Sequence, residues 1–265
     1  MLSCRLDETE MNFDFSLFLV IATGLSGAIW GLDRLLSRRH RLPEAEQAEP
    51  RIVEYARSFF PVLLIVLVVR SFLFEPFRIP SSSMMPTLLI GDFIFVNKYT
   101  YGLRLPVVNT RIFEVGDPER GDVIVFKLPA EPGTNYIKRL VGLPGDTVKY
   151  VDRNLYINGK LVERESKGRY EGDGQPGAQL YVEQLGSADH EILLMRGGRS
   201  NEGTFVVPQG HYFMMGDNRD NSKDSRYPGV GIIPEDKIVG KAVRIWMNWS
   251  FPKMPRWSRV GNAIR

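Results

Sequence analysis

The sequence predicts an all-β domain of antiparallel sheets that is preceded by two transmembrane α-helices. Two long apolar segments lie near the N-terminus, at residues 15–32 and 58–74. After Glu75 the chain breaks into short apolar or alternating segments that are rich in Val, Ile, Phe and Tyr and bounded by Gly, Pro, Asp or Asn. Such segments are typical of strands. About 190 residues follow the second apolar segment, which is enough to form a sizeable core.

The first apolar segment, residues 15–32, is expected to be a transmembrane helix that follows a short N-terminus at 1–14. It has 18 residues without a charge and as a helix would reach roughly 27 Å, nearly the thickness of a bilayer core. A cleavable signal peptide would instead need a basic leader. Here Arg5 is accompanied by four acidic residues, Asp7, Glu8, Glu10 and Asp14.

The second transmembrane helix is expected at 58–76, with Arg70 near one end, where its long side chain can reach the lipid headgroups. The segment between the helices, 33–57, carries six arginines, Arg34, Arg38, Arg39, Arg41, Arg51 and Arg57. The positive-inside rule therefore predicts that this loop is cytoplasmic, although four glutamates dilute its charge. The N-terminus and the β domain, 77–265, would then face outward, on the periplasmic side of the inner membrane.

Residues from about 147 to 207 look like an inserted β-subdomain. They begin as a tight hairpin through Asn158-Gly159 and then become Gly-rich and polar. We expect this insertion to be a surface elaboration that takes no part in chemistry.

The composition excludes several classes of function. The 34 basic and 31 acidic residues form no basic tract with interleaved aromatics, so no nucleic-acid partner is expected. Cys4 is the only cysteine, which leaves no intramolecular disulfide and no cysteine-based zinc site. The chain has three histidines and no His-Glu-x-x-His motif, so we expect neither a metal nor another cofactor.

Three serines, Ser81, Ser82 and Ser83, lie between Pro80 and Pro86, a few residues after the second apolar segment. By composition alone, serines beside prolines are ordinary turn residues. Their wider context changes this interpretation, because three long motifs follow one another along the domain.

The first motif, IPSSSMMPTLLIGD (79–92), resembles the active-site box of type I signal peptidases. The second, YIKRLVGLPGD (136–146), is similar to the lysine box of that family, and the third, GDNRDNSKDSR (216–226), is similar to its third box. All three occur in the family's order after two apolar spans. The resemblance implies a Ser-Lys serine endopeptidase that removes signal peptides from exported preproteins.

Residue by residue, the resemblance implies that Ser83 is the nucleophile and Lys138 the general base. It implies that the Ser81 hydroxyl and the backbone N–H of Ser83 bind the oxyanion. Many relatives have glycine where this chain has Ser82, which is a departure from the family pattern beside the oxyanion site.

The third motif supplies the supporting residues that the resemblance implies. Ser222 matches a serine that hydrogen-bonds the lysine amine, and Gly216 matches a position kept small beside the site. Asp224 and Arg226 match a structural ion pair that holds the loop.

The resemblance also implies how substrates bind. An extended peptide would add as a strand beside the chain that leads into Ser83. Small residues are expected at the first and third positions before the cut, as in Ala-x-Ala. Ile79, Tyr136 and Ile137 would line the pockets for them.

Acid-base chemistry independently favours Lys138 as the base. A serine hydroxyl needs a neutral base within hydrogen-bond reach, and this strand offers Lys138 beside Arg139. Strand alternation cannot choose between them, since both faces of the strand are apolar. Arginine stays protonated in proteins, whereas a buried lysine can lose its proton.

Two rival interpretations use other features. A Ser-His-Asp arrangement could use His211, but a histidine at the start of a strand is more often a turn or cross-strand residue. Asp217 and Asp220 could be a carboxylate pair, but Asp and Asn at such density usually shape a loop. A membrane-anchored β domain that binds extended export substrates without cutting them is the alternative function, which the intact Ser83 and Lys138 argue against.

The C-terminal region mixes aromatic and basic residues, namely Trp246, Trp249, Phe251 and Trp257 among Lys253, Arg256 and Arg259. This mixture suits the headgroup region of a membrane. Equally, Trp246 could lie in a strand core and the remainder could be a disordered basic tail. The expected partners are preproteins carrying signal peptides and the lipid bilayer, with the export translocon close by.

Overall fold

The structure is a computed structural model that describes residues 15–39, 50–104, 111–113, 115–186, 188–198, 200–252 and 254–265. The chain divides into two compact units, residues 1–73 with 104–112 and residues 74–103 with 113–265. The predicted outward N-terminus, 1–14, and the middle of the predicted cytoplasmic loop, 40–49, lie outside the described residues.

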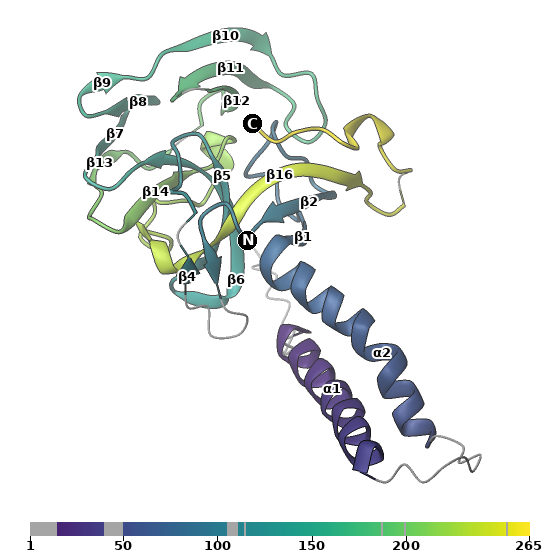
Figure 1. Ribbon diagram of the computed structural model, residues 1–265. Coiled ribbons are helices and arrows are strands. Elements are labelled where there is room, and N and C mark those ends of the chain that lie inside the picture. Colours follow the sequence, from purple (N-terminus) through teal and green to yellow (C-terminus); the bar gives the residue numbers. More distant parts are fainter. Residues whose placement is uncertain are drawn as a thin grey trace. The chain divides into compact units, whose positions relative to one another are not determined.

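The first unit contains two helices, α1 (Phe15–Arg39) and α2 (Arg51–Val68), which run side by side in Figure 1. A π-helical turn, η1 (Val69–Leu73), extends α2. The helices approach closely at Gly27, where a Cβ atom would lie 2.7 Å from the Phe60 ring. Leu17–Leu36 and Arg51–Leu73 are both long and apolar enough to cross a membrane, which confirms the prediction of two such helices.

The start of α2 differs from the prediction. The helix begins at Arg51 and not at residue 58, because the Pro50 carbonyl accepts hydrogen bonds from the N–H groups of Val53 and Glu54. Pro61 consequently lies inside the helix and not in its first turn. The first helix is also longer than predicted. It continues past residue 32 to Arg39, through leucine and arginine residues that favour helix.

The end of the second apolar segment also differs. Helical structure stops at Leu73, three residues before the predicted boundary at 76, and the strand β1 (Phe74–Arg78) follows directly. All of β1 pairs antiparallel with β2 (Asp92–Asn97), from Phe74 opposite Asn97 to Arg78 opposite Phe93. Pairing with a distant strand therefore decides the conformation of residues 74–76, and the β domain begins at Phe74.

The described part of the second unit is built on antiparallel sheets, as predicted. One sheet has seven strands in the order β1, β2, β16 (Ile238–Asn248), β5 (Val123–Leu128), β6 (Glu131–Gly142), β14 (His211–Met215) and β15 (Ile233–Pro234). The long strand β16 runs beside β2 in Figure 1. A further short pair, β3 (Leu103–Arg104) and β4 (Arg111–Phe113), has residues from both units.

The inserted segment forms two further sheets among the described residues. The first has the order β13 (Gly203–Val206), β7 (Thr147–Val151), β8 (Asn154–Ile157) and β9 (Lys160–Leu161). The second has the order β10 (Arg164–Arg169), β11 (Ala178–Leu185) and β12 (Ala188–Met195). The predicted hairpin is confirmed, because Ile157 pairs with Lys160 across Asn158 and Gly159, whose φ angles are 52° and 79°.

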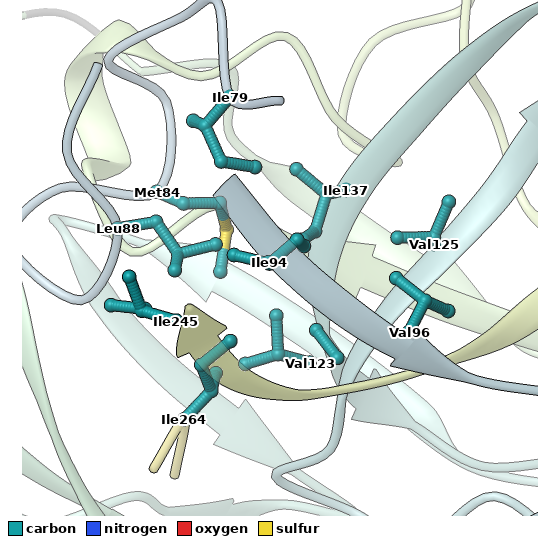
Figure 2. Close-up of a cluster of buried hydrophobic side chains, with 11 residues drawn as sticks. Ile79, Met84, Leu88, Ile94, Val96, Val123, Val125, Ile137, Ile245 and Ile264 are labelled. Atoms are coloured by element: carbon teal, nitrogen blue, oxygen red, sulfur yellow. The ribbon is translucent and has the colours of Figure 1, made fainter. Parts of the chain in front are cut away.

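An apolar core underlies the first motif. Its side chains come from the residues around the three serines and from the strands of the large sheet, and Figure 2 shows them converging. They are Ile79, Met84, Leu88, Ile94, Val96, Val123, Val125, Ile137, Ala242, Ile245 and Ile264. Burial of residues on both sides of the serines fixes the loop on the sheet, since each buried aliphatic side chain contributes about 1.5–3 kcal/mol.

Candidate active site

The large sheet brings the three motifs together. The first motif connects β1 to β2, and the second includes the part of β6 that carries Lys138. The third begins where β14 ends, and Met215 of β14 lies opposite Arg139 of β6. The residue after Met215 is Gly216, so the third motif leaves the sheet beside the lysine strand.

Ser83 and Lys138 are in direct contact. Lys138 Nζ lies 2.7 Å from Ser83 Oγ and donates a second hydrogen bond of 2.8 Å to the Ile137 carbonyl. Both side chains are buried, with exposed fractions of 8% for Ser83 and 4% for Lys138. A hydroxyl and an amine at this distance can exchange a proton directly.

Burial changes the acidity of the amine. It lowers the pKa of Lys138 to about 8, although the negative charges of Asp224 and Asp217 oppose the shift. The burial has a clear source, since Lys138 pairs with Ile124 across the sheet and its amine lies 5.4 Å from the centre of the Tyr136 ring. A substantial fraction of the amine is therefore neutral just above neutral pH.

The other two serines of the first motif directly precede Ser83 in the chain. Ser81 Oγ is 3.3 Å from Ser83 Oγ. The Ser82 carbonyl accepts a hydrogen bond of 3.0 Å from Asn218 Nδ2, so Ser82 contributes its backbone to the loop. The Ser82 side chain is half-buried.

Of the residues expected in the pockets, Ile79 and Ile137 are in the buried cluster around Met84, on neighbouring positions in Figure 2. Tyr136 is half-buried and packs on the Phe126 ring at a centroid distance of 6.1 Å. Ile79 and Ile137 are 2% and 9% exposed, and both pack with Met84, the residue after Ser83.

Gly216 lies at the closest approach of two loops. A Cβ atom at this position would lie 2.2 Å from Ser222 Oγ and 2.5 Å from the carbonyl oxygen of Ser83. Only glycine fits between the two serines without displacing one of them.

Ser222 is buried, but its expected hydrogen bond to Lys138 is absent from the structure. Among the described residues its hydroxyl has no hydrogen-bond partner. The reason is geometric, because the Lys138 amine is directed to Ser83 Oγ and the Ile137 carbonyl. A buried hydroxyl without a partner is costly.

Asp224 and Arg226 form an ion pair that is completely buried. Two parallel hydrogen bonds of 2.8 Å join the guanidinium to the carboxylate, and both side chains are 0% exposed. Asp224 also accepts the backbone N–H of Gly216 at 3.0 Å. The pair thus holds the end of the third motif against its beginning, and loss of one partner from such a pair costs about 3–5 kcal/mol.

The sequence interpretation missed a second buried ion pair, between Arg139 and Asp217. The guanidinium of Arg139 donates to the two carboxylate oxygens at 2.8 and 2.7 Å, and both side chains are 1% exposed. The Thr87 hydroxyl donates to the same carboxylate at 2.5 Å. Adjacent strand residues point to opposite faces, so Arg139 beside Lys138 was a signal for a partner on the other face.

Asn218 is the other residue that was missed. Its backbone N–H donates to the Ser83 carbonyl at 3.1 Å, while its side chain holds the Ser82 carbonyl. This role is seen only in the folded chain, since the first and third motifs are far apart in sequence. Asn218 thereby ties the third motif directly to the backbone of Ser83.

The rival candidates have other roles, and Asp217 is the buried partner of Arg139. His211 Nδ1 bonds to the Gln209 carbonyl at 2.9 Å, and the residue pairs with Pro234 at the edge of the sheet. Asp220 accepts hydrogen bonds from Arg153, the Ser200 hydroxyl and the Met195 N–H, which is a role in shaping the loop. Within the described ranges, no three His, Cys, Asp or Glu residues are grouped so that they could hold a metal ion.

Comparisons with known proteins identify the family. The family described as "Signal peptidase, peptidase S26" matches residues 52–247. Signal peptidase I of Pseudomonas aeruginosa is 50% identical over 95% of this chain and 99% of its own, and that of Pseudomonas fluorescens is 49% identical with the same coverage. A crystal structure of a signal peptidase I from Enterococcus faecalis covers 48% of this chain and 98% of its own, with 30% identity and a TM-score of 0.31. The chain therefore belongs to the signal peptidase I family, peptidase S26.

Proposed function

We propose that this signal peptidase removes signal peptides from exported proteins by a Ser-Lys mechanism, with Ser83 as nucleophile and Lys138 as general base. The observation that supports the mechanism most directly is the contact of 2.7 Å between Lys138 Nζ and Ser83 Oγ, made by a buried amine whose pKa is lowered to about 8. No cofactor is needed for this chemistry.

In the proposed reaction, the neutral Lys138 amine takes the proton of Ser83 as the hydroxyl oxygen attacks the carbonyl carbon of the scissile bond. The oxyanion that forms receives hydrogen bonds from the Ser83 N–H and the Ser81 hydroxyl. The ammonium of Lys138 then protonates the leaving amine, and the mature protein departs. Water, deprotonated by the same lysine, hydrolyses the acyl-enzyme and frees Ser83.

Gly216, Ser222 and the Asp224–Arg226 pair have supporting roles in this proposal. The ion pair fixes the third motif, and Gly216 leaves space for Ser222 close to Ser83. A small rotation of Ser222 would let its unpartnered hydroxyl bond to the Lys138 amine, as the family resemblance implies. Such a bond would orient the amine once Ser83 has been acylated.

Substrate selectivity is proposed to come from small pockets beside Ile79, Tyr136 and Ile137. A preprotein whose signal peptide ends in Ala-x-Ala should be cleaved. Trp or Lys just before the cut should lower kcat/KM by roughly a hundredfold or more, because a bulky side chain would clash with the apolar wall of the pocket. Purified protein in detergent is assayed on preproteins that differ only at this position, with Ser83→Ala as the inactive control. Equal rates for Ala and Trp would contradict the pocket assignment, and activity of Ser83→Ala would contradict the mechanism.

The location proposed for the chain is the inner membrane, with both helices spanning it and the β domain on the periplasmic face. Three arginines between the two candidate spans, Arg38, Arg39 and Arg41, support this orientation through the positive-inside rule. Exposed aromatic side chains near the C-terminus support a further contact of the β domain with lipid headgroups: Trp249 is 43%, Trp257 72% and Phe251 85% exposed. The bilayer and the emerging preproteins near the export translocon are thus the proposed partners.

Protease added to intact spheroplasts tests this topology. Digestion is expected to remove the β domain while an epitope tag inserted at residue 46 stays intact, because the loop that carries the tag would be cytoplasmic. Permeabilised cells serve as the control, in which the tag is digested as well. Loss of the tag with protection of the β domain in intact spheroplasts would reverse the orientation.

A further inference from the structure

Strand β12 of the inserted segment contacts the third motif through the backbone. The N–H of Leu193 in β12 donates to the Asp217 carbonyl at 2.9 Å, and Leu193 forms a parallel bridge with Asn218. Asn218 in turn holds the carbonyls of Ser82 and Ser83. A continuous line of backbone hydrogen bonds therefore runs from the insertion to the proposed nucleophile.

A buried cluster of charges makes a second connection between the same elements. Glu183 of β11 forms two hydrogen bonds with the guanidinium of Arg219, which directly follows Asn218, and both side chains are 1% exposed. His190 lies opposite Glu183 on β12. Its Nε2 atom is 3.5 Å from Glu183 and 4.0 Å from Asp217, the partner of Arg139.

The ionisable side chains of this cluster form one row, in which burial lowers the pKa of His190 and so favours its neutral ring. Arg139 on the lysine strand is followed by Asp217, then by His190 between two carboxylates, then by Glu183 and finally by Arg219. Burial alone would raise the pKa of Glu183, but Arg219 and His190 outweigh it and lower the pKa to about 2. The carboxylate is consequently ionised at every pH at which the enzyme would work.

Such a buried pair is a poor way to gain stability, because well-packed apolar residues of the same volume stabilise a protein as well or better. The Glu183–Arg219 pair has a more specific effect on the geometry of the loop than on stability. Two parallel hydrogen bonds fix the angle and the distance between β11 and the residue after Asn218. An apolar contact between the same elements would allow sliding.

We infer that Glu183 is a positioning residue of the active site: by clamping Arg219 it holds Asn218 in the place that orients the Ser83 backbone. The inference rests on the proposed role of Ser83 and Lys138. It gives the insertion a part in the reaction and so replaces the expectation of a surface elaboration without chemistry. Glu183 itself touches neither the substrate nor the reacting atoms.

The test compares Glu183→Gln with Glu191→Gln in the full-length, detergent-solubilised protein. Both changes remove one carboxylate from the insertion, but Glu191 is exposed and lies next to His190 on β12. For Glu183→Gln we expect kcat to fall on the order of tenfold to a hundredfold while KM changes by less than about threefold, since the substrate surface is retained and the nucleophile is displaced. Glu191→Gln should keep wild-type kcat and KM.

A purely structural role of Glu183 predicts a different pattern. Glu183→Gln would then lower Tm but keep wild-type kcat at temperatures where circular dichroism shows the variant to be folded, and this result would overturn the inference. The double variant Glu183→Gln with Arg219→Gln separates the two roles further. It removes the guanidinium that Glu183→Gln alone would leave buried without its carboxylate partner. We expect it to recover Tm but not kcat; recovery of kcat together with Tm would also overturn the inference.

If Glu183→Gln does not fold, Glu183→Asp takes its place, since it keeps the charge and shortens the reach. An intermediate loss of kcat supports the clamp, and wild-type kcat contradicts it. Ser83→Ala is assayed beside these variants. An inactive Ser83→Ala with a fully active, folded Glu183 variant rejects only the positioning role, whereas an active Ser83→Ala rejects the proposed mechanism itself.

Discussion

Replacing Lys138 with arginine is expected to abolish cleavage as completely as replacing it with alanine. The charge is conserved, but a guanidinium stays protonated and cannot accept the proton of Ser83. It also needs more room than the buried amine, which lies 2.7 Å from Ser83 Oγ. We expect kcat to fall by roughly a thousandfold or more in both variants, because the loss removes the general base and leaves the nucleophile unactivated.

The measurement is single-turnover cleavage of an Ala-x-Ala preprotein by purified variants. Lys127→Arg is a matched control, since Lys127 is exposed and lies on β5 next to the lysine strand. This control should retain wild-type turnover, as should His211→Ala. Wild-type turnover in Lys138→Arg, or a loss in His211→Ala equal to that in Ser83→Ala, would show that another group is the base.

The same lysine sets the expected pH dependence. Its pKa is lowered to about 8 by burial, and only the neutral amine can act as the base. The rate should therefore be highest above pH 8 and fall on the acidic side, by about tenfold per pH unit once the amine is mostly protonated. A rate that stays constant from pH 8 down to pH 6 would be incompatible with Lys138 as the titrating base.

The sequence was sufficient to predict the local features of the fold. The apolar segments predicted both helices, and the short apolar segments bounded by turn residues predicted the antiparallel β domain. Strand β10 was not identified, because polar residues dominate it and almost all of its six residues are exposed. Strands β11 and β12 were not assigned either. The first three residues of β1 were assigned to the second helix, since Phe74 continues an apolar segment and only its pairing with Asn97 shows otherwise.

Some residues of the candidate site could likewise be predicted from the sequence, and others could not. Ser83 and Lys138 were predictable because each lies within a long motif, and the chemistry of a buried amine distinguishes Lys138 from Arg139. The contacts of Asn218 and Glu183 were not, since both depend on segments that meet only in the folded chain. The proposed nucleophile and base each lie in a motif that can be read from the sequence, whereas the contacts that hold the site in place form only in the folded chain.

The second large effect is expected at Gly216, where the loops that meet only in the folded chain approach most closely. In Gly216→Ala the new Cβ atom would lie 2.2 Å from Ser222 Oγ and 2.5 Å from the Ser83 carbonyl oxygen, both far below contact distance. The Ser83 carbonyl is held by the Asn218 N–H, so relief of the clash must move either Ser222 or the nucleophile's own backbone. Overpacking of this kind costs about 1–3 kcal/mol of stability.

The catalytic consequence should exceed the loss of stability. A displacement of the Ser83 backbone by about 1 Å would take Oγ out of hydrogen-bond reach of Lys138 and lower kcat on the order of a hundredfold. Gly229→Ala is the matched control, because the nearest atoms to a Cβ there belong to the flexible end of Lys223, at 3.3 Å. Steady-state kinetics and thermal unfolding of the two variants separate the effects. A Gly216→Ala enzyme that is folded and as active as Gly229→Ala would mean that Ser222 yields to the methyl group and that the position of Ser83 does not depend on this glycine.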